Sequence, residues 1–215
     1  MIFVALAPPI FRSTLILFTG HEVYDPTSLD ALYFGGIISQ ISTLAVLAYI
    51  LFRQGRSLAQ IGFSFAWLDL LQSVLLALMA FVAAYLWRAG TLYGYYFLTK
   101  SVPTVRPQSV GFLAAGITLP SLIYVLLNPF NEELIVRAFT ISEVEYLTKR
   151  SSVAVIVSIF LQTSYHLYQG VFTAWGYVPM FFIFSLYYVK WKRITPVILA
   201  HLYFDLLALL TVAKH

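Results

Sequence analysis

Long apolar runs, each followed by a short polar or basic segment, repeat along most of this sequence. The hydrocarbon core of a bilayer is about 30 Å thick, so a helix needs about 20 mainly apolar residues to cross it. Runs that reach or approach this length cover residues 31–52, 67–87, 110–127, 151–168, 171–189 and 196–213. The sequence therefore predicts an all-α, polytopic membrane helix bundle.

Composition excludes the soluble alternative. Only 10% of the 215 residues are charged, whereas a soluble domain carries about 25%, so the chain cannot cover a surface that faces water. We expect one membrane domain over residues 1–215 with about six to eight transmembrane helices. The chain has no cysteine, which excludes disulfides and thiolate metal sites. Its net charge of +4 is spread over short loops, which indicates membrane topology and not nucleic-acid binding.

Several segments depart from the simple pattern. The first 20 residues carry Arg12 after their apolar run, so they predict an interfacial or spanning helix and not a signal peptide. Residues 88–109 are polar and contain Pro and Gly, which predicts a loop or surface segment. The stretch "NPFNEE" predicts a helix break after Leu127 and a restart that runs to about Tyr146. Basic residues close three of the runs, and by the positive-inside rule these ends face the cytoplasm.

Ionisable residues inside apolar runs cost roughly 2.5–3.5 kcal/mol each, so those that occur are candidate functional groups. Six of them are Glu132, Glu133, Arg137, His166, His201 and Asp205. Glu133 and Arg137 are four residues apart and can pair on one helix face. The same spacing separates His201 from Asp205, and a carboxylate one turn away can fix the tautomer of a histidine ring. Gln162 and Asp69 are interpreted as packing and interface residues.

These residues also form an ordered set of motifs. "EELIVR" matches the EExxxR signature, His166 stands where the FxxxH motif is expected, and "HLYFD" matches HxxxN/D. Over residues 113–212 the chain thus resembles the CAAX-protease and bacteriocin-processing (CPBP) family, related to type II CAAX prenyl endopeptidases. Two positions differ from the family pattern, because Gln162 replaces an aromatic residue and Asp205 replaces the commoner Asn.

The resemblance implies an intramembrane endopeptidase that acts on membrane-associated peptides or proteins. It implies that Glu132 activates a water held by His166, and that His201, steered by Asp205, stabilises the tetrahedral intermediate. Arg137 would hold Glu133 away from the water. The choice of Glu132 as the base rests on the resemblance, since spacing alone does not distinguish the two glutamates. An ionised Asp205 accepts hydrogen bonds and cannot donate one to an oxyanion, so Asp205 either orients His201 or is protonated.

Several alternatives remain open. Glu132, His166 and His201 are a possible zinc set, although no obligate metal is expected. The same fold without activity would serve as a membrane scaffold or immunity protein. A proton-coupled transporter also uses intramembrane Glu and His, but it predicts internal repeats, and the sequence contains none. The small size favours a prokaryotic plasma membrane.

Overall fold

The computed structural model describes residues 2–19, 29–103 and 117–212, and the described residues are helical with no strand among them. The all-α prediction is therefore confirmed. The elements are α1 (Ile2–Thr19), α2 (Leu29–Arg53), η2 (Leu58–Ile61), α3 (Leu68–Thr99), α4 (Leu119–Glu132), η4 (Glu133–Phe139), α5 (Thr140–Thr148), α6 (Ser151–Tyr165), η5 (Leu167–Gln169), α7 (Val171–Trp191) and α8 (Thr195–Val212).

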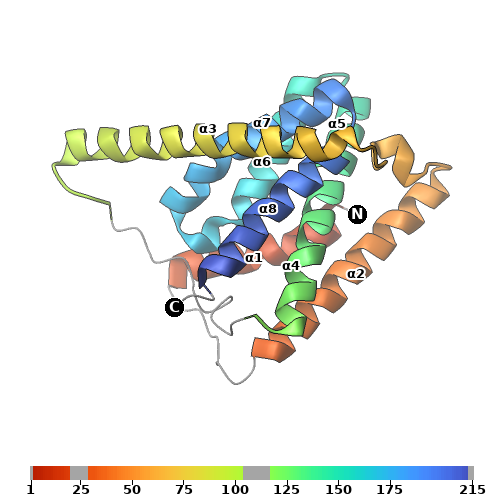
Figure 1. Ribbon diagram of the computed structural model, residues 1–215, viewed down its shortest axis with the longest axis horizontal. Helices are drawn as coiled ribbons and strands as arrows, with labels where there is room; N and C mark the ends of the chain where they lie inside the picture. Colours follow the sequence, from red (N-terminus) through yellow and green to blue (C-terminus); the bar gives the residue numbers. More distant parts are fainter. Residues whose placement is uncertain (1, 20–28, 104–116, 213–215) are drawn as a thin grey trace.

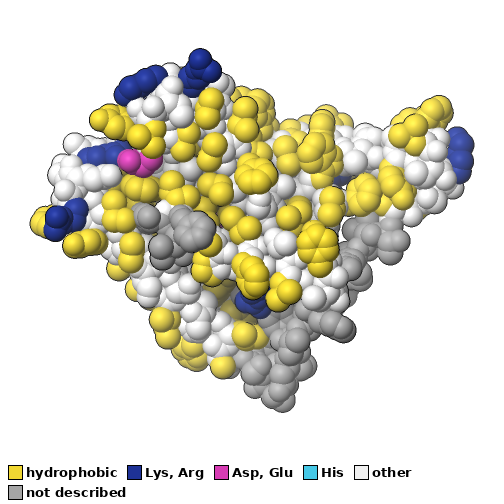
Figure 2. All heavy atoms as spheres, turned by 180° about the vertical axis from the view of Figure 1, so that it is seen from behind, with side chains coloured by type: hydrophobic (Ala, Val, Ile, Leu, Met, Phe, Trp, Pro, Cys, Tyr) yellow, Lys and Arg dark blue, Asp and Glu magenta, His cyan; other side chains and the backbone are white. Residues whose placement is uncertain are grey.

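Three of the described helices are long and apolar enough to cross a membrane: Ala31–Arg53, Leu68–Thr99 and Val171–Trp191. Three further apolar helices are shorter, namely Ala5–Thr19, Ser151–Tyr165 and Thr195–Thr211. Hydrophobic side chains cover much of the face drawn in Figure 2, as expected where lipid is the solvent. The count of six to eight transmembrane helices stays a prediction.

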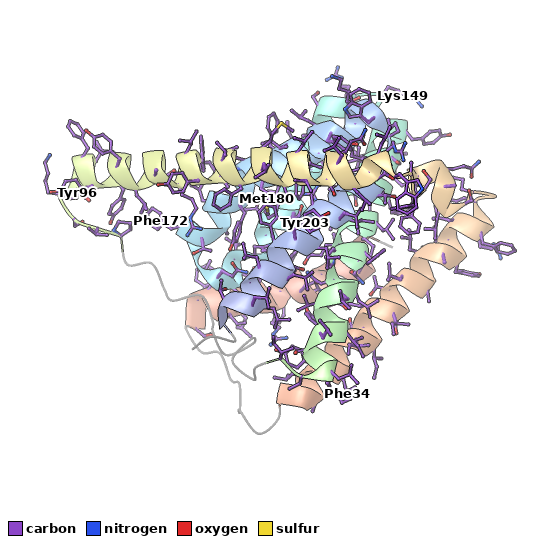
Figure 3. All side chains as sticks on the ribbon, viewed as in Figure 1. Phe34, Tyr96, Lys149, Phe172, Met180 and Tyr203 are labelled. Carbon is purple, nitrogen blue, oxygen red and sulfur yellow. The ribbon has the colours of Figure 1, made fainter. Side chains whose placement is uncertain are left out.

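The helices pack around a core that the segment Glu133–Phe139 shares with residues of α1, α2, α3, α5, α6, α7 and α8. The long α3 lies across α7 and α8, while α2 packs on α4 and α1 packs on α6 (Figure 1). Between α3 and α8, the Ser73 and Tyr203 hydroxyl oxygens are 3.0 Å apart, and Tyr203 lies close to the α3 ribbon in Figure 3. The helices that precede the C-terminal half of the chain thus pack against it on several sides.

Two predicted breaks are wrong. Residues 88–99, predicted as a loop, continue α3 to Thr99, and the helix ends where Lys100 adopts a left-handed conformation (φ 57°). No proline occurs in this stretch before Pro103, and Arg88 is accommodated against Gly176 of α7. The predicted break at "NPFNEE" is also absent, because α4 includes Pro129 and continues directly into Glu133–Phe139. Residues 110–116 of the predicted third run lie outside the described part of the chain.

Ion pairs join the basic segments at one end of the bundle. Arg56, after α2, lies 2.5 Å from Glu143 of α5. Lys192, after α7, pairs with Glu145 of α5. Hydrogen bonds to Glu145 from Lys192 and then from Ser151 lower the pKa of this carboxyl. The predicted cytoplasmic ends are therefore held together by one short helix.

A second contact at this end involves Asp69, at the start of α3. Its side chain is fully buried, accepts a hydrogen bond from the Ala66 N–H (2.8 Å) and lies 2.8 Å from Arg193. Of the two interpretations, packing or interface, the structure agrees with packing, because Arg193 of the α7–α8 turn lies over the buried carboxylate. Asp69 thus connects α3 to the segment that begins α8.

Gly62 is required where this turn meets η2. Its φ is +87°, a Cβ at this position would lie 2.3 Å from the Lys192 carbonyl oxygen, and its own carbonyl accepts from Ile194 N–H at 3.0 Å. We expect Gly62→Ala to lower the free energy of unfolding by more than the roughly 1–2 kcal/mol that a left-handed alanine costs. Gly55→Ala is the control, because Gly55 has φ +66° but a Cβ added there would meet no atom within 4 Å. Equal losses of thermal stability in detergent would contradict this expectation.

Candidate active site

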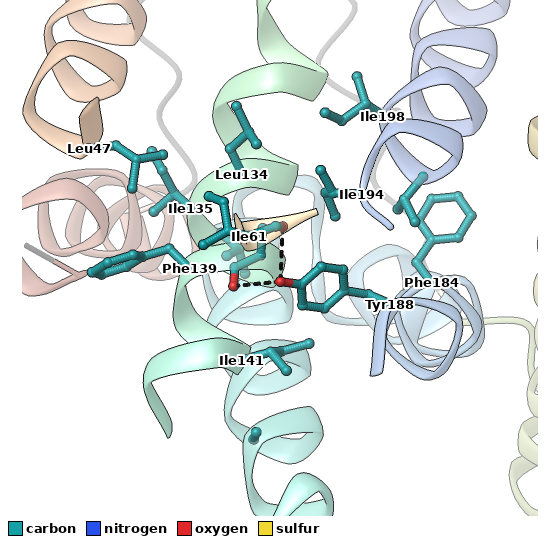
Figure 4. Packing of buried hydrophobic residues seen from close by; sticks show 14 of the residues in the cluster. Leu47, Ile61, Leu134, Ile135, Phe139, Ile141, Phe184, Tyr188, Ile194 and Ile198 are labelled. Carbon is teal, nitrogen blue, oxygen red and sulfur yellow. Dashed lines mark hydrogen bonds between the residues drawn. The ribbon is translucent and has the colours of Figure 1, made fainter. Parts of the chain in front are cut away.

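A π-helical segment, Glu133–Phe139, lies at the centre of the site, and all of its residues are buried. Side chains from other elements bond to its carbonyl oxygens: the Ser158 hydroxyl donates to Val136 O (2.8 Å), and the Tyr188 hydroxyl donates to Ala138 O (3.1 Å; Figure 4). Within the same chain segment, Thr140 donates to Ile135 O (2.8 Å). Short π-helical segments are frequent at functional sites, and this one is supported on several sides.

Glu133 and Arg137 form the expected pair, and both side chains are fully buried. Arg137 also donates to the Gln162 side-chain oxygen at 2.5 Å, and its guanidinium lies 5.1 Å from the centre of the Phe184 ring. A buried charge is tolerated only when it is paired and hydrogen-bonded. These contacts therefore hold the Glu133 carboxylate in one place.

His201 is held by Glu133. Its Nδ1 lies 2.6 Å from Glu133 Oε1, whereas its Nε2 lies 3.5 Å from Asp205 Oδ1 and 4.0 Å from Glu132 Oε2. The sequence assigned the orienting role to Asp205, but the shorter contact is with Glu133 on another helix. The Nε2 side of the ring consequently faces two further carboxylates.

Glu132 occupies a different environment from its neighbour. Its carboxylate accepts a hydrogen bond from the Tyr165 hydroxyl (2.7 Å), and Gln162 Nε2 lies 3.4 Å away. Its side chain remains 16% exposed. Sequence reasoning missed Tyr165 and treated Gln162 as a packing residue, although Gln162 at a motif position normally aromatic was the available signal. Gln162 in fact contacts both Glu132 and Arg137.

His166 ends α6, and its Nδ1 lies 2.8 Å from the Gln162 carbonyl oxygen. Because a carbonyl only accepts, Nδ1 carries the proton and Nε2 is left with its lone pair when the ring is neutral. The ring packs against Tyr165 (centroids 4.6 Å apart) and Phe181 (5.2 Å). The contact with the Gln162 carbonyl fixes the orientation of the His166 ring. The side chain of the same Gln162 contacts Glu132.

A cavity of about 570 Å³ opens onto these residues. Glu132, Val136, Tyr165 and His166 line one side of it, and α1 and α2 supply most of the other walls. His201 and Asp205 are not among its lining residues. The candidate base and one histidine are thus accessible from the cavity, while the second histidine lies behind them.

The order of motifs, the buried pair and the cavity agree with the comparison to known families. Residues 114–207 match the family model described as type II CAAX prenyl endopeptidase Rce1-like. They form an Rce1-like domain. The resemblance predicted from the three motifs is confirmed over these residues, and the matched domain together with the apolar helices supports a CAAX protease-type membrane protein. No curated protein and no solved structure matches the chain.

Glu132, His166 and His201, the zinc set left open by the sequence, are not brought together as a ligand group in the described residues. Among the described residues there is no group of three His, Asp or Glu side chains that could hold a metal ion. Zinc ligands lie about 2.0–2.2 Å from the metal, and the Glu132 carboxylate is hydrogen-bonded to the Tyr165 hydroxyl. We therefore derive no step of the reaction through a metal.

Proposed function

We propose that this protein is a multi-pass intramembrane endopeptidase of a prokaryotic plasma membrane, in which Glu132 activates the water that hydrolyses a peptide bond. The observation that carries the proposal is the position of Glu132, a partly exposed carboxylate on the cavity wall beside His166. A general base must lie within hydrogen-bond reach of the proton that it abstracts. A cavity wall that carries a carboxylate and an imidazole can hold a water by both groups and present it to a substrate in the cavity.

The two glutamates have separate roles in this proposal. Glu133 is fully buried, with Oε2 on Arg137 and Oε1 on His201, and it does not line the cavity. Glu132 is oriented by Tyr165 and faces the cavity. Their difference in environment supports Glu132 as the base and Glu133 as the group that positions His201.

The reaction would proceed in two steps. Glu132 takes a proton from a water that also donates to Nε2 of His166, and the resulting hydroxide attacks the scissile carbonyl carbon. A ring of His201 protonated on both nitrogens donates from Nδ1 to Glu133, and its positive charge behind the cavity wall favours the negative charge that develops on the carbonyl oxygen. Glu132 then returns its proton to the leaving amine, and the C–N bond breaks. No cofactor is needed to balance this sequence.

The cavity walls favour a membrane-associated peptide as substrate. Residues of α1 and α2 that line it include Leu6, Ile16 and Leu32, together with Ser39 and Gln40. An extended segment of peptide needs apolar contact for its side chains and polar groups for its backbone. A peptide that enters from the bilayer would meet both on its way to Glu132.

The test is hydrolysis of membrane peptides by the purified protein in detergent, in water enriched in ¹⁸O. We expect new termini in the mass spectrum, one ¹⁸O atom in each new carboxyl group, and no effect of a chelator. His166→Ala should lower kcat/KM by about 100- to 1,000-fold, because the water loses one of its two partners. Loss of the wild-type rate with chelator and its return with zinc would contradict the metal-free mechanism. A wild type that cleaves no peptide in the pool would favour the inactive scaffold.

A further inference from the structure

Asn128 stands one helical turn before Glu132 on α4, so the two side chains share a face of that helix. Both line the same cavity. Asn128 was not singled out by any motif. Its side-chain amide reaches from α4 to Asp205 on α8.

Two hydrogen bonds define the orientation of the Asn128 amide. Its Nδ2 donates to Asp205 Oδ2 (3.1 Å), and its Oδ1 accepts from Gln40 Nε2 (3.3 Å). An ionised carboxylate only accepts, so the nitrogen, and not the oxygen, must face Asp205. The Nδ2 group carries two hydrogens, and the structure gives it one partner among the described residues.

The residues that hold this amide are themselves fixed. Gln40 of α2 is 7% exposed, and its carbonyl oxygen accepts from the Asn131 side chain at 3.0 Å. On the other side, Asp205 Oδ1 lies 3.5 Å from His201 Nε2. Donors held in place before the reaction stabilise developing charge better than donors that must reorganise. Asn128 has this property, and it borders the cavity.

We propose that Asn128 is a catalytic residue whose second Nδ2–H donates to the oxyanion of the tetrahedral intermediate, and that Asp205 and Gln40 position it. This inference rests on the hydrolysis proposed above. Asp205 stands at the motif position where an asparagine is commoner and cannot itself donate a hydrogen bond when ionised. The donor amide therefore comes from α4, and Asp205 accepts from it. The charge develops when hydroxide adds to the carbonyl carbon, and Asn128 keeps its proton throughout.

The decisive experiment exchanges the two side chains. We expect Asn128→Asp to lower kcat by about 100- to 1,000-fold, with KM changed less than about threefold, because the donor is lost. In the double variant Asn128→Asp/Asp205→Asn the amide and the carboxylate change places, so we expect at least about a tenfold recovery of kcat over Asn128→Asp. Tyr187→Phe is the control, because it removes another bond between helices, from Tyr187 to Gln72 (2.7 Å), away from the cavity. It should keep the wild-type rate.

A binding measurement separates a catalytic from a structural role without turnover. A peptidyl phosphinate imitates the anionic tetrahedral intermediate, whereas the parent peptide amide does not. Asn128→Ala should weaken phosphinate binding about 100-fold and peptide binding less than threefold. Equal weakening of both ligands, an unchanged kcat in Asn128→Ala, or a double variant no faster than Asn128→Asp would overturn the inference. A different result would overturn the role of Glu132 in the proposed hydrolysis: Glu132→Gln would cleave at the wild-type rate while the Asn128 variants still lose activity.

Discussion

Glu132→Gln should remove peptide hydrolysis almost completely, lowering kcat by about 10²- to 10⁴-fold, which is the usual contribution of a general base. The substitution keeps the shape of the side chain, and the amide oxygen can still accept from the Tyr165 hydroxyl, now 2.7 Å from the carboxylate. The apparent melting temperature should therefore stay near that of the wild type. The measurement is single-turnover cleavage of a fixed peptide, with stability followed in the same detergent.

Glu143→Gln is the matched control for this change. Glu143 is also a glutamate near the end of the same helical run, but it pairs with Arg56 and does not line the cavity. We expect this variant to cleave at close to the wild-type rate. A Glu132→Gln protein that cleaves as fast as Glu143→Gln would show that another group activates the water.

The largest effect on stability should come from Arg137→Ala. Removing this side chain leaves the fully buried carboxylate of Glu133 without its guanidinium partner, and breaking a buried pair on one side costs about 3–5 kcal/mol. The cost is high because lipid and packed side chains offer Glu133 no water. Thermal or denaturant unfolding in detergent should show a large loss of stability, and activity should fall with it because His201 depends on Glu133.

Arg56→Ala breaks another pair of arginine with glutamate, one that is partly exposed and not fully buried. The Arg56 and Glu143 side chains are 30% and 21% exposed, and such a pair contributes about 1 kcal/mol or less. A double change, Glu133→Leu with Arg137→Leu, should recover part of the stability lost in Arg137→Ala, because no unpaired charge remains. Equal losses of stability in Arg137→Ala and Arg56→Ala would contradict the expectation that burial makes the loss of Arg137 more costly.

The sequence was informative where spacing along one helix decides the contact. Four-residue spacing predicted the pair of Glu133 with Arg137, and it is present. Hydrophobic length predicted most of the helices, because a bilayer imposes a minimum run of apolar residues. The order of the three motifs predicted the family that the comparison then identified. Each of these inferences uses information contained within a short window.

Contacts between helices were not predictable in the same way. Whether His201 bonds to Asp205 or to Glu133 depends on how α8 is rotated against the π-helical segment, and the spacing along α8 favoured the wrong partner. The π-helical segment itself changes the hydrogen-bond register without altering the apolar composition that the sequence displays. Asn128 and Gln162 were overlooked because an uncharged amide in an apolar run is a weak signal, although their bonds connect separate helices.

The length of α3 has a consequence for how the protein sits in lipid. A helix of 32 residues is about 48 Å long, well above the thickness of the hydrocarbon core, about 30 Å. To fit entirely, α3 would need a tilt of roughly 50°, outside the range of about 0–40° that transmembrane helices adopt. Tyr93, Tyr96 and Phe97 are exposed in its final turns, and Tyr96 is labelled there in Figure 3. We therefore expect these turns to reach the headgroup layer, the level at which aromatic side chains anchor membrane proteins.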